Sequence, residues 1–368
     1  MITPSNTVPL GRSNLQVTRL GLGMRPLGLL QVSQQAEAAE IIRVAINLGI
    51  GLLDTAPTYG LGESERRLGQ VSSDLPASIV VSTKVGKILA PSRPRRPVRE
   101  ILAETLGGGP AAIAGLTVKA ARKVGGAITP QPQAAGERLA ASSDYSYDAT
   151  MRSVELSLER TGLDRFGIVY IHDPDNHLDE AMSGAFRALE RLRGDGTIAA
   201  VGASSNHCEP LLHLAGEGDF DCFLLAGRYS LLDQSAFEEL LPVAQERGIS
   251  MVIGGVFNSG ILADPSSKPF FDYAAASNVQ IERTRRLDDI CRRHGVSLKA
   301  AAIQFPSAHP AVSSVLIGVA SVAELEEDVR LAGILVPDAL WEECRHEGLL
   351  AEGTPVPSGR MGPEPTPA

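Results

Sequence analysis

Short apolar runs recur along the chain, and each leads through a turn into a stretch with helical periodicity. The eight runs are LGLG from Leu20, GLLD from Gly51, IVVS from Ile79, GIVYIH from Gly167, IAAVG from Ile198, DCFLLAG from Asp221, SMVIGG from Ser250 and SSVLIG from Ser313. Continuous apolar runs are typical of parallel strands that are covered on both faces. Most of them begin about 23 to 32 residues apart, the length of a strand, a helix and two loops. The pattern predicts an α/β fold, a closed (β/α)8 TIM barrel with an N-terminal β-hairpin.

Amphipathic helices are expected between these strands. From Tyr147 to Gly162 apolar residues recur at three- and four-residue spacing, and Gly162 is a suitable helix end. The segments from Ala185 and Glu239 end in the same way. We assign these helices a structural role only.

Two intervals are too long for the regular spacing. About 88 residues separate the third and fourth strands, and about 64 separate the seventh and eighth, where we expect a long loop. The first interval contains an insertion, residues 87–146, with nine basic and four acidic residues. We expect it to be a lid or a surface excursion on the single barrel domain, residues 1–352. The proline- and glycine-rich tail, 353–368, is expected to be disordered.

Composition and charge indicate which kinds of molecule this protein binds. With 43% hydrophobic and 21% charged residues the chain is ordinary for a globular protein. Its formal net charge of −9 disfavours nucleic acid and acidic membranes and favours a small-molecule partner. Four separated cysteines, without metal-ligand spacing, suit a reducing compartment. The N-terminus lacks signal-peptide features and no apolar run is long enough to cross a bilayer, so we predict a cytoplasmic protein. Because the cysteines lack metal-ligand spacing, we predict no metal site.

Four polar residues follow neighbouring strands. Asp54 and Tyr59 follow the second strand, Lys84 ends the third and His172 ends the fourth. Each has an ordinary structural explanation by itself, such as a helix cap or a solvated loop residue. Together, at the carboxyl ends of barrel strands where barrel enzymes keep their active sites, they predict a catalytic group.

In this order, DTAPTYG with ESERRLG, STKVG and IHDPD resemble the motifs of the aldo-keto reductase superfamily, over roughly residues 8–332. FLLAGRYSLLDQ, VIGGVFNSGIL and AIQFPSAHPAVSSVLIG are most similar to the bacterial NAD-dependent aldose 1-dehydrogenases, a group close to pyridoxal 4-dehydrogenase. The resemblance implies hydride transfer between a nicotinamide and a carbonyl or alcohol carbon. Tyr59 would donate the proton in reduction and accept it in oxidation.

The chemistry of the four residues agrees with this role. A lysine cation about 4 Å from a phenol contributes roughly 4 kcal/mol at an effective dielectric near 20, so we expect Lys84 to lower the pKa of Tyr59. Asp54 would hold Lys84 in an ion pair. His172 would hydrogen-bond the substrate oxygen and set its angle of approach.

The cofactor site is expected away from a Rossmann motif. In GLGMRPLG the third glycine, Gly28, comes too late for GxGxxG. The resemblance implies instead an extended nicotinamide cofactor across the barrel mouth, with Ser204 and Ser205 near the carboxamide and backbone amides of VFNSG around the pyrophosphate. The full set of expected contacts is Gly23, Met24, Asp54, Ser204, Ser205, Gly255, Val256, Phe257, Asn258, Ser259, Gly260, Gly318, Val319, Ala320, Glu324, Glu327 and Asp328. Ala226 and Gly254 stand where many relatives have a glutamine and a stacking aromatic residue.

The charge pattern favours NAD over NADP. No lysine or arginine lies between Lys299 and Arg330, and Glu324 stands where an arginine often contacts the 2′-phosphate. A carboxylate repels a phosphate but accepts hydrogen bonds from ribose hydroxyls. A basic residue of the insertion folding over the site would reverse this preference.

Few aromatic residues surround the motifs, which favours a polar substrate such as a sugar, oxidised at C1 to a lactone. Arg25 and Arg228 are further substrate-binding candidates beside Tyr59 and His172, and Arg25 suggests an anionic substrate. A surface position explains either arginine equally well. The oligomeric state is left open.

Three other functions remain. The same enzyme could work as a carbonyl reductase in a biosynthetic pathway. A nicotinamide-binding regulatory subunit shares this barrel. HDPDNH, with His172, Asp173, Asp175 and His177, also permits a metal-dependent hydrolase.

Overall fold

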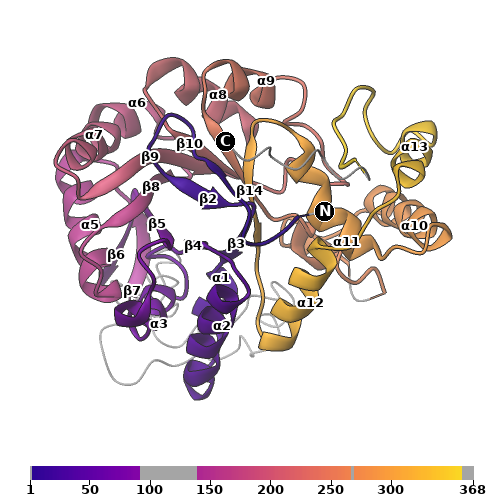
Figure 1. Ribbon diagram of the computed structural model, residues 1–368. Coiled ribbons are helices and arrows are strands. Elements are labelled where there is room, and N and C mark those ends of the chain that lie inside the picture. The colour runs from indigo at the N-terminus through magenta and orange to yellow at the C-terminus, as the bar shows by residue number, and fades with distance from the viewer. Residues whose placement is uncertain (1, 92–138, 267–268, 359–368) are drawn as a thin grey trace, which may run out of the picture. The chain divides into compact units, whose positions relative to one another are not determined.

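The computed structural model describes residues 2–91, 139–266 and 269–358 (Figure 1). Eight parallel strands close into a barrel in the order β10-β11-β14-β3-β4-β5-β8-β9. Their bounds are β3 (Leu20–Gly23), β4 (Leu52–Asp54), β5 (Val80–Val85), β8 (Phe166–His172), β9 (Ile198–Ser205), β10 (Cys222–Ala226), β11 (Ser250–Gly254) and β14 (Val312–Ile317). All eight predicted strands are present within a residue or two of the expected start, and the predicted barrel is confirmed.

Helices surround this barrel (Figure 1). They are α1 (Arg25–Leu29), α2 (Gln35–Asn47), α3 (Glu63–Gly69), α5 (Tyr147–Thr161), α6 (Leu178–Glu180), α7 (Arg187–Gly194), α8 (Cys208–Glu217), α9 (Leu240–Glu246), α10 (Asn278–Arg293), α11 (Leu298–Gln304), α12 (Val322–Ala332) and α13 (Asp338–His346). A π-helical segment, Ala181–Phe186, precedes α7, and short 3-10 turns are formed by Val32–Gln34, Ser72–Asp74, Asn258–Gly260 and Phe305–Ala308. Helix α5 ends at left-handed Gly162, as predicted, and Ser146 caps its beginning by accepting from Ala149 N.

Three two-stranded sheets lie outside the barrel. The expected N-terminal hairpin is the antiparallel pair β1 (Thr7–Pro9) and β2 (Gln16–Thr18). The others pair β6 (Lys87–Pro91) with β7 (Leu139–Ser143) and β12 (Phe270–Phe271) with β13 (Ala274–Ala275). Chain contacts separate Leu89–Ser142 as a compact unit of its own. The expected lid at 87–146 falls largely on residues 92–138, outside the described residues, so that function stays a prediction.

The alternation of side chains along each strand builds the barrel interior in layers. Residues two apart on a strand face the same side. Leu52, Val80, Ile168, Tyr170 and Cys222 belong to one buried cluster. The same alternation therefore carries Asp54, Lys84 and His172 inward above that cluster. The apolar cluster thus lies directly beneath the polar side chains of Asp54, Lys84 and His172.

The ring of Tyr170 occupies space that the neighbouring strand leaves free. A Cβ on Gly202 would lie 2.4 Å from Tyr170 Cδ1 and 2.8 Å from Cys222 O. We expect Gly202→Ala to lower the free energy of unfolding by about 1–3 kcal/mol, because the barrel interior must shift to accept the methyl group. Urea unfolding measures this effect. Gly216→Ala is the matched control, since nothing lies within 4 Å of a Cβ there; equal stability of the two variants would contradict the packing described here.

The long loop expected after the seventh strand is present between β11 and α10; it contains the paired strands β12 and β13, and Ser277 and Gln280 form a capping box at the start of the sixteen-residue helix α10. One sequence expectation for the fold differs from the structure. The start of the tail is ordered rather than disordered: Thr354 is buried and its carbonyl accepts a hydrogen bond from Arg345 Nη2 at 2.9 Å. Residues 359–368 lie outside the described residues.

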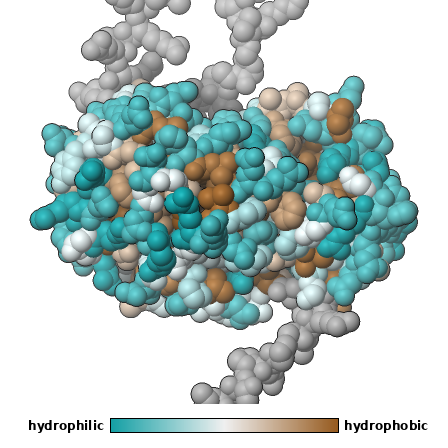
Figure 2. All heavy atoms as spheres, turned by 90° about the horizontal axis from the view of Figure 1, so that it is seen from above, coloured by the Kyte–Doolittle hydropathy of each residue, from teal (hydrophilic) through white to brown (hydrophobic). Residues whose placement is uncertain are grey.

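The surface seen in Figure 2 is mostly hydrophilic, with a few separate apolar patches. Within the described ranges no helix is both long and apolar enough to cross a membrane.

Candidate active site

The four predicted catalytic residues meet at the carboxyl ends of β4, β5 and β8. Lys84 lies between Asp54 and Tyr59, with its Nζ 4.6 Å from the centroid of the Tyr59 ring. The Tyr59 and His172 rings stand edge to face with centroids 6.2 Å apart. Tyr59, Lys84 and His172 line one cavity of about 380 Å³, called here the smaller cavity. The group expected from the sequence is therefore assembled at one place.

Asp54 and Lys84 form a buried ion pair. Lys84 Nζ donates to Asp54 Oδ1 at 2.8 Å, to Oδ2 at 2.7 Å and to the Thr55 carbonyl at 2.9 Å. Ser82, which pairs with Asp54 in the sheet register, donates its hydroxyl to Asp54 Oδ1 at 2.7 Å. Burial is the largest single effect and would lower the pKa of Lys84, but the charge of Asp54, the neighbouring Tyr59 and the hydrogen bonds to both together raise that pKa. Lys84 is thus a fixed cation that cannot swing away from Tyr59.

The expected lowering of the Tyr59 pKa is wrong for the protein alone. Burial raises this pKa, and the Lys84 cation opposes the effect without overcoming it, while Asp54 adds to it. In the sequence the proximity of Lys84 is visible but the desolvation of the ring is not, which is why the cation was given the larger weight. Tyr59 is consequently a protonated phenol at neutral pH, in hydrogen-bond contact with Lys84.

His172 is a neutral imidazole. Burial, and then the charges of Lys84 and Lys87, lower its pKa well below the usual range. Its Nε2 lies 3.6 Å from Asp173 Oδ2, and its buried Nδ1 has no hydrogen-bond partner among the described residues. His172 as a whole lines the smaller cavity together with Tyr59, a position suited to contact a substrate oxygen.

These pKa directions predict a pH dependence that differs between the two reaction directions. The raised Tyr59 pKa keeps the phenol protonated, so kcat for carbonyl reduction should change little between about pH 6 and 9. Alcohol oxidation needs the phenolate, so its kcat should rise with pH by up to tenfold per unit. Steady-state profiles in both directions measure this. His172→Gln is the control that should retain both slopes; reduction lost through an apparent pKa near 7 would contradict the assignment.

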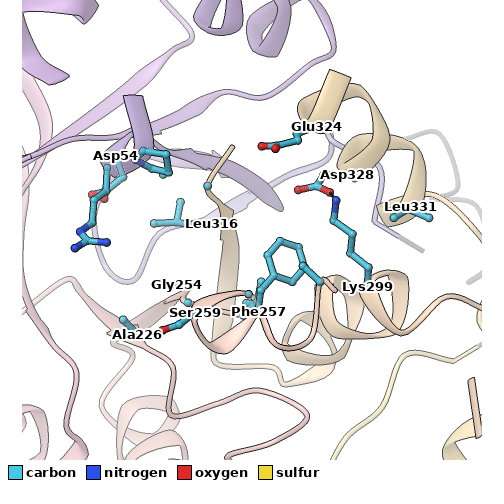
Figure 3. Close-up of a pocket in the computed structure, with 18 of the residues that line it drawn as sticks. Asp54, Ala226, Gly254, Phe257, Ser259, Lys299, Leu316, Glu324, Asp328 and Leu331 are labelled. Atoms are coloured by element: carbon cyan, nitrogen blue, oxygen red, sulfur yellow. Dashed lines mark ion pairs between the residues drawn. The ribbon is translucent and has the colours of Figure 1, made fainter. Parts of the chain in front are cut away.

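A larger cavity, about 870 Å³, extends across the barrel mouth from Asp54 to α12 (Figure 3). Figure 3 shows Asp54 at one end, Lys299, Asp328 and Leu331 at the other, and Phe257 and Leu316 between them. Among the predicted cofactor contacts, those that line it are Gly23, Asp54, Gly255, Val256, Phe257, Ser259, Gly260, Gly318, Glu324, Glu327 and Asp328. Ser204 and Ser205 line the smaller cavity.

Four of the expected cofactor contacts are not in either lining. Met24 is buried, with its amide bonded to the Asp54 carbonyl and its carbonyl to the Ser64 hydroxyl. Asn258 accepts from Ser230 Oγ at 2.6 Å and donates to Gly227 O at 3.1 Å, so its side chain holds the turn in place. Val319 and Ala320 also lie outside both linings, although Ala320 N donates to Glu324 Oε2 at 2.7 Å.

The far end of the larger cavity contains Lys299 and Arg330, the two cations that border the stretch of sequence without lysine or arginine. Lys299 contacts Glu327 Oε2 at 2.7 Å and Asp328 Oδ1 at 2.5 Å, and Arg330 lines the same wall. The gap between Lys299 and Arg330 in the sequence therefore does not leave this end without positive charge. Two carboxylates balance Lys299, and the mutual attraction lowers the pKa of Glu327.

The two arginines predicted to bind the substrate differ in position. Arg25 lines both cavities, with its guanidinium carbon 4.6 Å above the Tyr273 ring. Arg228 is outside both linings and is paired with Asp233 at 3.3 Å and Asp272 at 2.5 Å. The structure therefore brings Arg25, and not Arg228, beside the catalytic group.

Several lining residues were missed from the sequence, among them Thr58, Lys87, Asn206, Leu224, Tyr273, Ser297, Lys299 and Leu316. Lys87 and Asn206 stand just beyond the ends of β5 and β9, a position that marks the mouth of a barrel. Tyr273 had no such signal, because it comes from the irregular segment after β11.

The residues of HDPDNH do not gather around one point. Asp175 bonds His207 at 2.7 Å, and His177 bonds Glu180 at 3.1 Å. Within the part of the chain that the structure describes, no group of three or more histidine, cysteine or acidic side chains is arranged to hold a metal ion. The geometry offers nothing to support the hydrolase alternative.

Comparisons with known proteins match nearly the whole chain. Residues 19–346 match the profile described as Aldo/keto reductase family. The chain is 39% identical to a pyridoxal 4-dehydrogenase from Microbacterium luteolum, over 93% of this chain and 97% of the relative. It is 35% identical to a D-threo-aldose 1-dehydrogenase from a Pseudomonas species, over 94% of this chain and 99% of the relative.

Solved structures agree on the fold. An aldo-keto reductase from Bacillus halodurans, in its holo form, has a TM-score of 0.69 at 23% identity and covers 95% of this chain and 98% of its own. A glycerol dehydrogenase from Gluconobacter oxydans gives the same TM-score of 0.69 at 19% identity, covering 99% of both chains.

Proposed function

This chain belongs to the aldo/keto reductase family and is an oxidoreductase that uses a nicotinamide cofactor, and from that premise we propose that it oxidises an aldose or a related hydroxy-aldehyde at C1 with NAD, giving a lactone. The observation that carries the proposal is the group formed by buried Asp54 and Lys84 with half-buried Tyr59 and His172 beside two adjoining cavities. Polar side chains beside the reacting centre, among them Thr58, Ser204 and Asn206, suit a ligand with several hydroxyls.

The catalytic roles follow from the contacts. Tyr59 accepts the hydroxyl proton of the substrate as its C–H bond breaks, and Lys84 stabilises the phenolate that this requires. Asp54 keeps Lys84 charged and oriented. His172, which lines the smaller cavity with Tyr59, contacts the substrate oxygen. When bound, the oxidised nicotinamide supplies the acceptor for the hydride that leaves the same carbon.

The lining of the larger cavity fits an extended dinucleotide. Small residues form its wall near Tyr59: a Cβ on Gly254 would find only Leu224 and Ala226 side chains, at 3.7 and 3.8 Å, so a flat ring can lie close to the backbone. Left-handed Gly255 and Gly260 form the neighbouring turn, and nothing lies within 4 Å of a Cβ on Gly260. Open backbone of this kind permits close approach of a pyrophosphate.

The acidic rim at the far end supports NAD as the cofactor. Glu324, Glu327 and Asp328 all line it, while Lys299 is balanced by two of them. A 2′-phosphate there would meet net negative charge, whereas ribose hydroxyls find acceptors.

Changing one carboxylate should shift this preference. We expect Glu324→Arg to raise the ratio of kcat/KM for NADP to that for NAD by about tenfold or more, the effect of roughly one charge-assisted contact. Glu324→Gln is the matched control, because its amide oxygen can still accept from Ala320 N. An unchanged ratio in Glu324→Arg would overturn the charge argument.

The two relatives guide the choice of substrates. One is named for D-threo-aldoses and the other for pyridoxal, and in each of these substrates a hydroxyl can close on the aldehyde as a cyclic hemiacetal. A cyclic hemiacetal gives a lactone by hydride loss alone, without added water. We therefore propose this class for the chain.

A substrate panel tests the proposal. Formation of reduced nicotinamide should be followed by ultraviolet absorbance with L-fucose, D-arabinose, L-galactose and pyridoxal, each with NAD and NADP. Turnover of at least one, faster with NAD, is the expected result. Lack of turnover with all of them and with simple alcohols and aldehydes would sink the proposal.

One observation favours the reverse reaction as a second candidate. The raised pKa of Tyr59 keeps the phenol protonated at neutral pH, the state that donates to a carbonyl. Carbonyl reduction with the reduced cofactor is therefore the alternative, and the same panel with aldehydes and ketones decides between the directions.

The four cysteines are free, consistent with our proposal of a cytoplasmic location.

A further inference from the structure

We propose that Arg25 is a specificity-determining residue that binds an anionic oxygen group of the substrate, a carboxylate or a phenolate, beside the reacting carbon. The proposal rests on the function proposed above, since it names the class of substrate for that same site. It begins from the position of Arg25, which lines both the larger and the smaller cavity together with Tyr59.

The charge of Arg25 is not balanced by the protein. Of the cations around the catalytic end, Lys84 is paired with Asp54, and Arg228 with Asp233 and Asp272. Within the described residues no carboxylate lies within ion-pair distance of Arg25, and no hydrogen bond engages its guanidinium. A cation that the fold leaves unpaired in the wall of a substrate cavity is a suitable partner for an anion on the ligand.

Tyr273 lies beside this guanidinium. Its ring centroid is 4.6 Å from the guanidinium carbon, a cation–π distance. The N–H groups at the edge of the guanidinium plane are left free to donate. Such an edge matches two oxygens of a carboxylate, or one phenolate oxygen, better than a point charge would.

The segment that carries Tyr273 is itself anchored. Tyr273 N donates to Ser259 Oγ at 3.0 Å, and the neighbouring Asp272 is bound by Arg228 at 2.5 Å. Arg228, which the sequence suggested as a substrate ligand, therefore fixes the support of Arg25 instead. The two arginines therefore have different roles: Arg25 lines both cavities, and Arg228 anchors the segment that carries Tyr273.

Other charges in the smaller cavity agree with an anionic ligand. Lys87 also lines it, and its Nζ contacts Ser143 Oγ at 3.1 Å. Asp173 is the acidic side chain of that lining, and burial, together with nearby Asp175, raises its pKa. The Arg25 charge also acts on Tyr59, whose pKa it lowers slightly against the dominant effect of burial. An anion placed on Arg25 is thus close to the group that exchanges the proton.

Matched substrate pairs test the inference with NAD-saturated full-length protein. The pairs are D-galacturonate with D-galactose, and pyridoxal with 3-deoxypyridoxal, which separate a carboxylate from a phenolate. We expect the anionic member of at least one pair to have the higher kcat/KM. Arg25→Gln should lower that value about 10–100-fold while changing the neutral member less than about threefold, as for loss of one charge-assisted hydrogen bond. A neutral member that is preferred, or an equal loss for both members, would overturn the inference.

Control variants separate local binding from overall charge. Arg25→Lys keeps the charge without the planar edge and should retain part of the preference. Tyr273→Phe should retain it and Tyr273→Ala should lose part of it, because only the second removes the ring. Arg43→Gln removes one positive charge on the exposed face of α2 and should change neither member of a pair.

Calorimetric titration of D-galacturonate and of pyridoxal into NAD-bound Tyr59→Phe protein, with and without Arg25→Gln, provides a readout of binding, because this background is expected to bind NAD without turnover. If no substrate is oxidised but one of these anions binds and Arg25→Gln abolishes binding, the proposed reaction fails while the anion site stands. If neutral substrates are turned over and Arg25→Gln changes neither binding nor rate, the anion site fails while the proposed reaction stands.

Discussion

Replacing Tyr59 with phenylalanine is expected to reduce kcat in both directions by about 10²–10⁴-fold, the usual contribution of a positioned acid–base group. The change removes one oxygen and keeps the ring that stands edge to face with His172 and beside Lys84. The site should therefore keep its shape and lose only the group that exchanges a proton with the substrate. Steady-state kinetics with the best substrate of the panel measures the effect.

Cofactor affinity provides the control for that prediction. The cavity proposed for the dinucleotide extends away from Tyr59 toward α12, so Tyr59→Phe should change the Kd for NAD less than about threefold. Fluorescence titration measures it. If NAD binding is lost together with turnover, Tyr59 has a structural role and the assignment fails.

The second large effect is expected at Lys84. Lys84→Met leaves Asp54 buried without its cation, which should lower the free energy of unfolding by about 3–5 kcal/mol, because removal of one partner exposes the full desolvation cost of the other. Turnover should fall as well, since the phenolate of Tyr59 would lose its neighbouring positive charge. Urea unfolding and steady-state kinetics measure the two losses.

A double variant separates the two effects of the ion pair. Asp54→Asn alone should also destabilise the protein, because it leaves the Lys84 cation buried without a counter-charge. The double variant Asp54→Asn with Lys84→Met should be more stable than the sum of the single losses predicts, yet remain inactive. Additive losses of stability would show that the two side chains are not coupled in the folded protein.

Strand positions were predictable because the physical signal is local. A parallel strand covered on both faces is predominantly apolar, and the eight runs are of this kind apart from a few serines and the polar residues at some of their ends. The same alternation that places Ile168 and Tyr170 in the interior places His172 above them, so the strand ends could predict which residues of the proposed catalytic group lie together.

The balance of energies at the site was not predictable in the same way. The sequence indicated that Lys84 would lie near Tyr59, but the pKa of Tyr59 depends on how completely the ring is removed from water. That quantity comes from packing of many distant residues. Desolvation proved the larger effect and reversed the expected direction.

Ion pairs between segments that are distant in the sequence could also be identified only from the structure. Lys299 is nearly thirty residues before Glu327 and Asp328, and Arg228 is more than forty before Asp272. The sequence shows how many charged residues lie near the far end of the larger cavity, but it does not show which of the cations are paired with carboxylates. The contrast between paired Arg228 and unpaired Arg25 became visible only in the fold.

Hydride transfer from the reacting carbon is tested most directly by following the hydrogen on that carbon. The best aldose of the panel, deuterated at C1, should be oxidised by the full-length protein with NAD, and the reduced cofactor analysed by mass spectrometry and proton NMR. We expect deuterium at C4 of the nicotinamide and no comparable transfer with Tyr59→Phe. Loss of the label to solvent, or equal transfer by the variant, would contradict the proposed reaction and the role of Tyr59 in it.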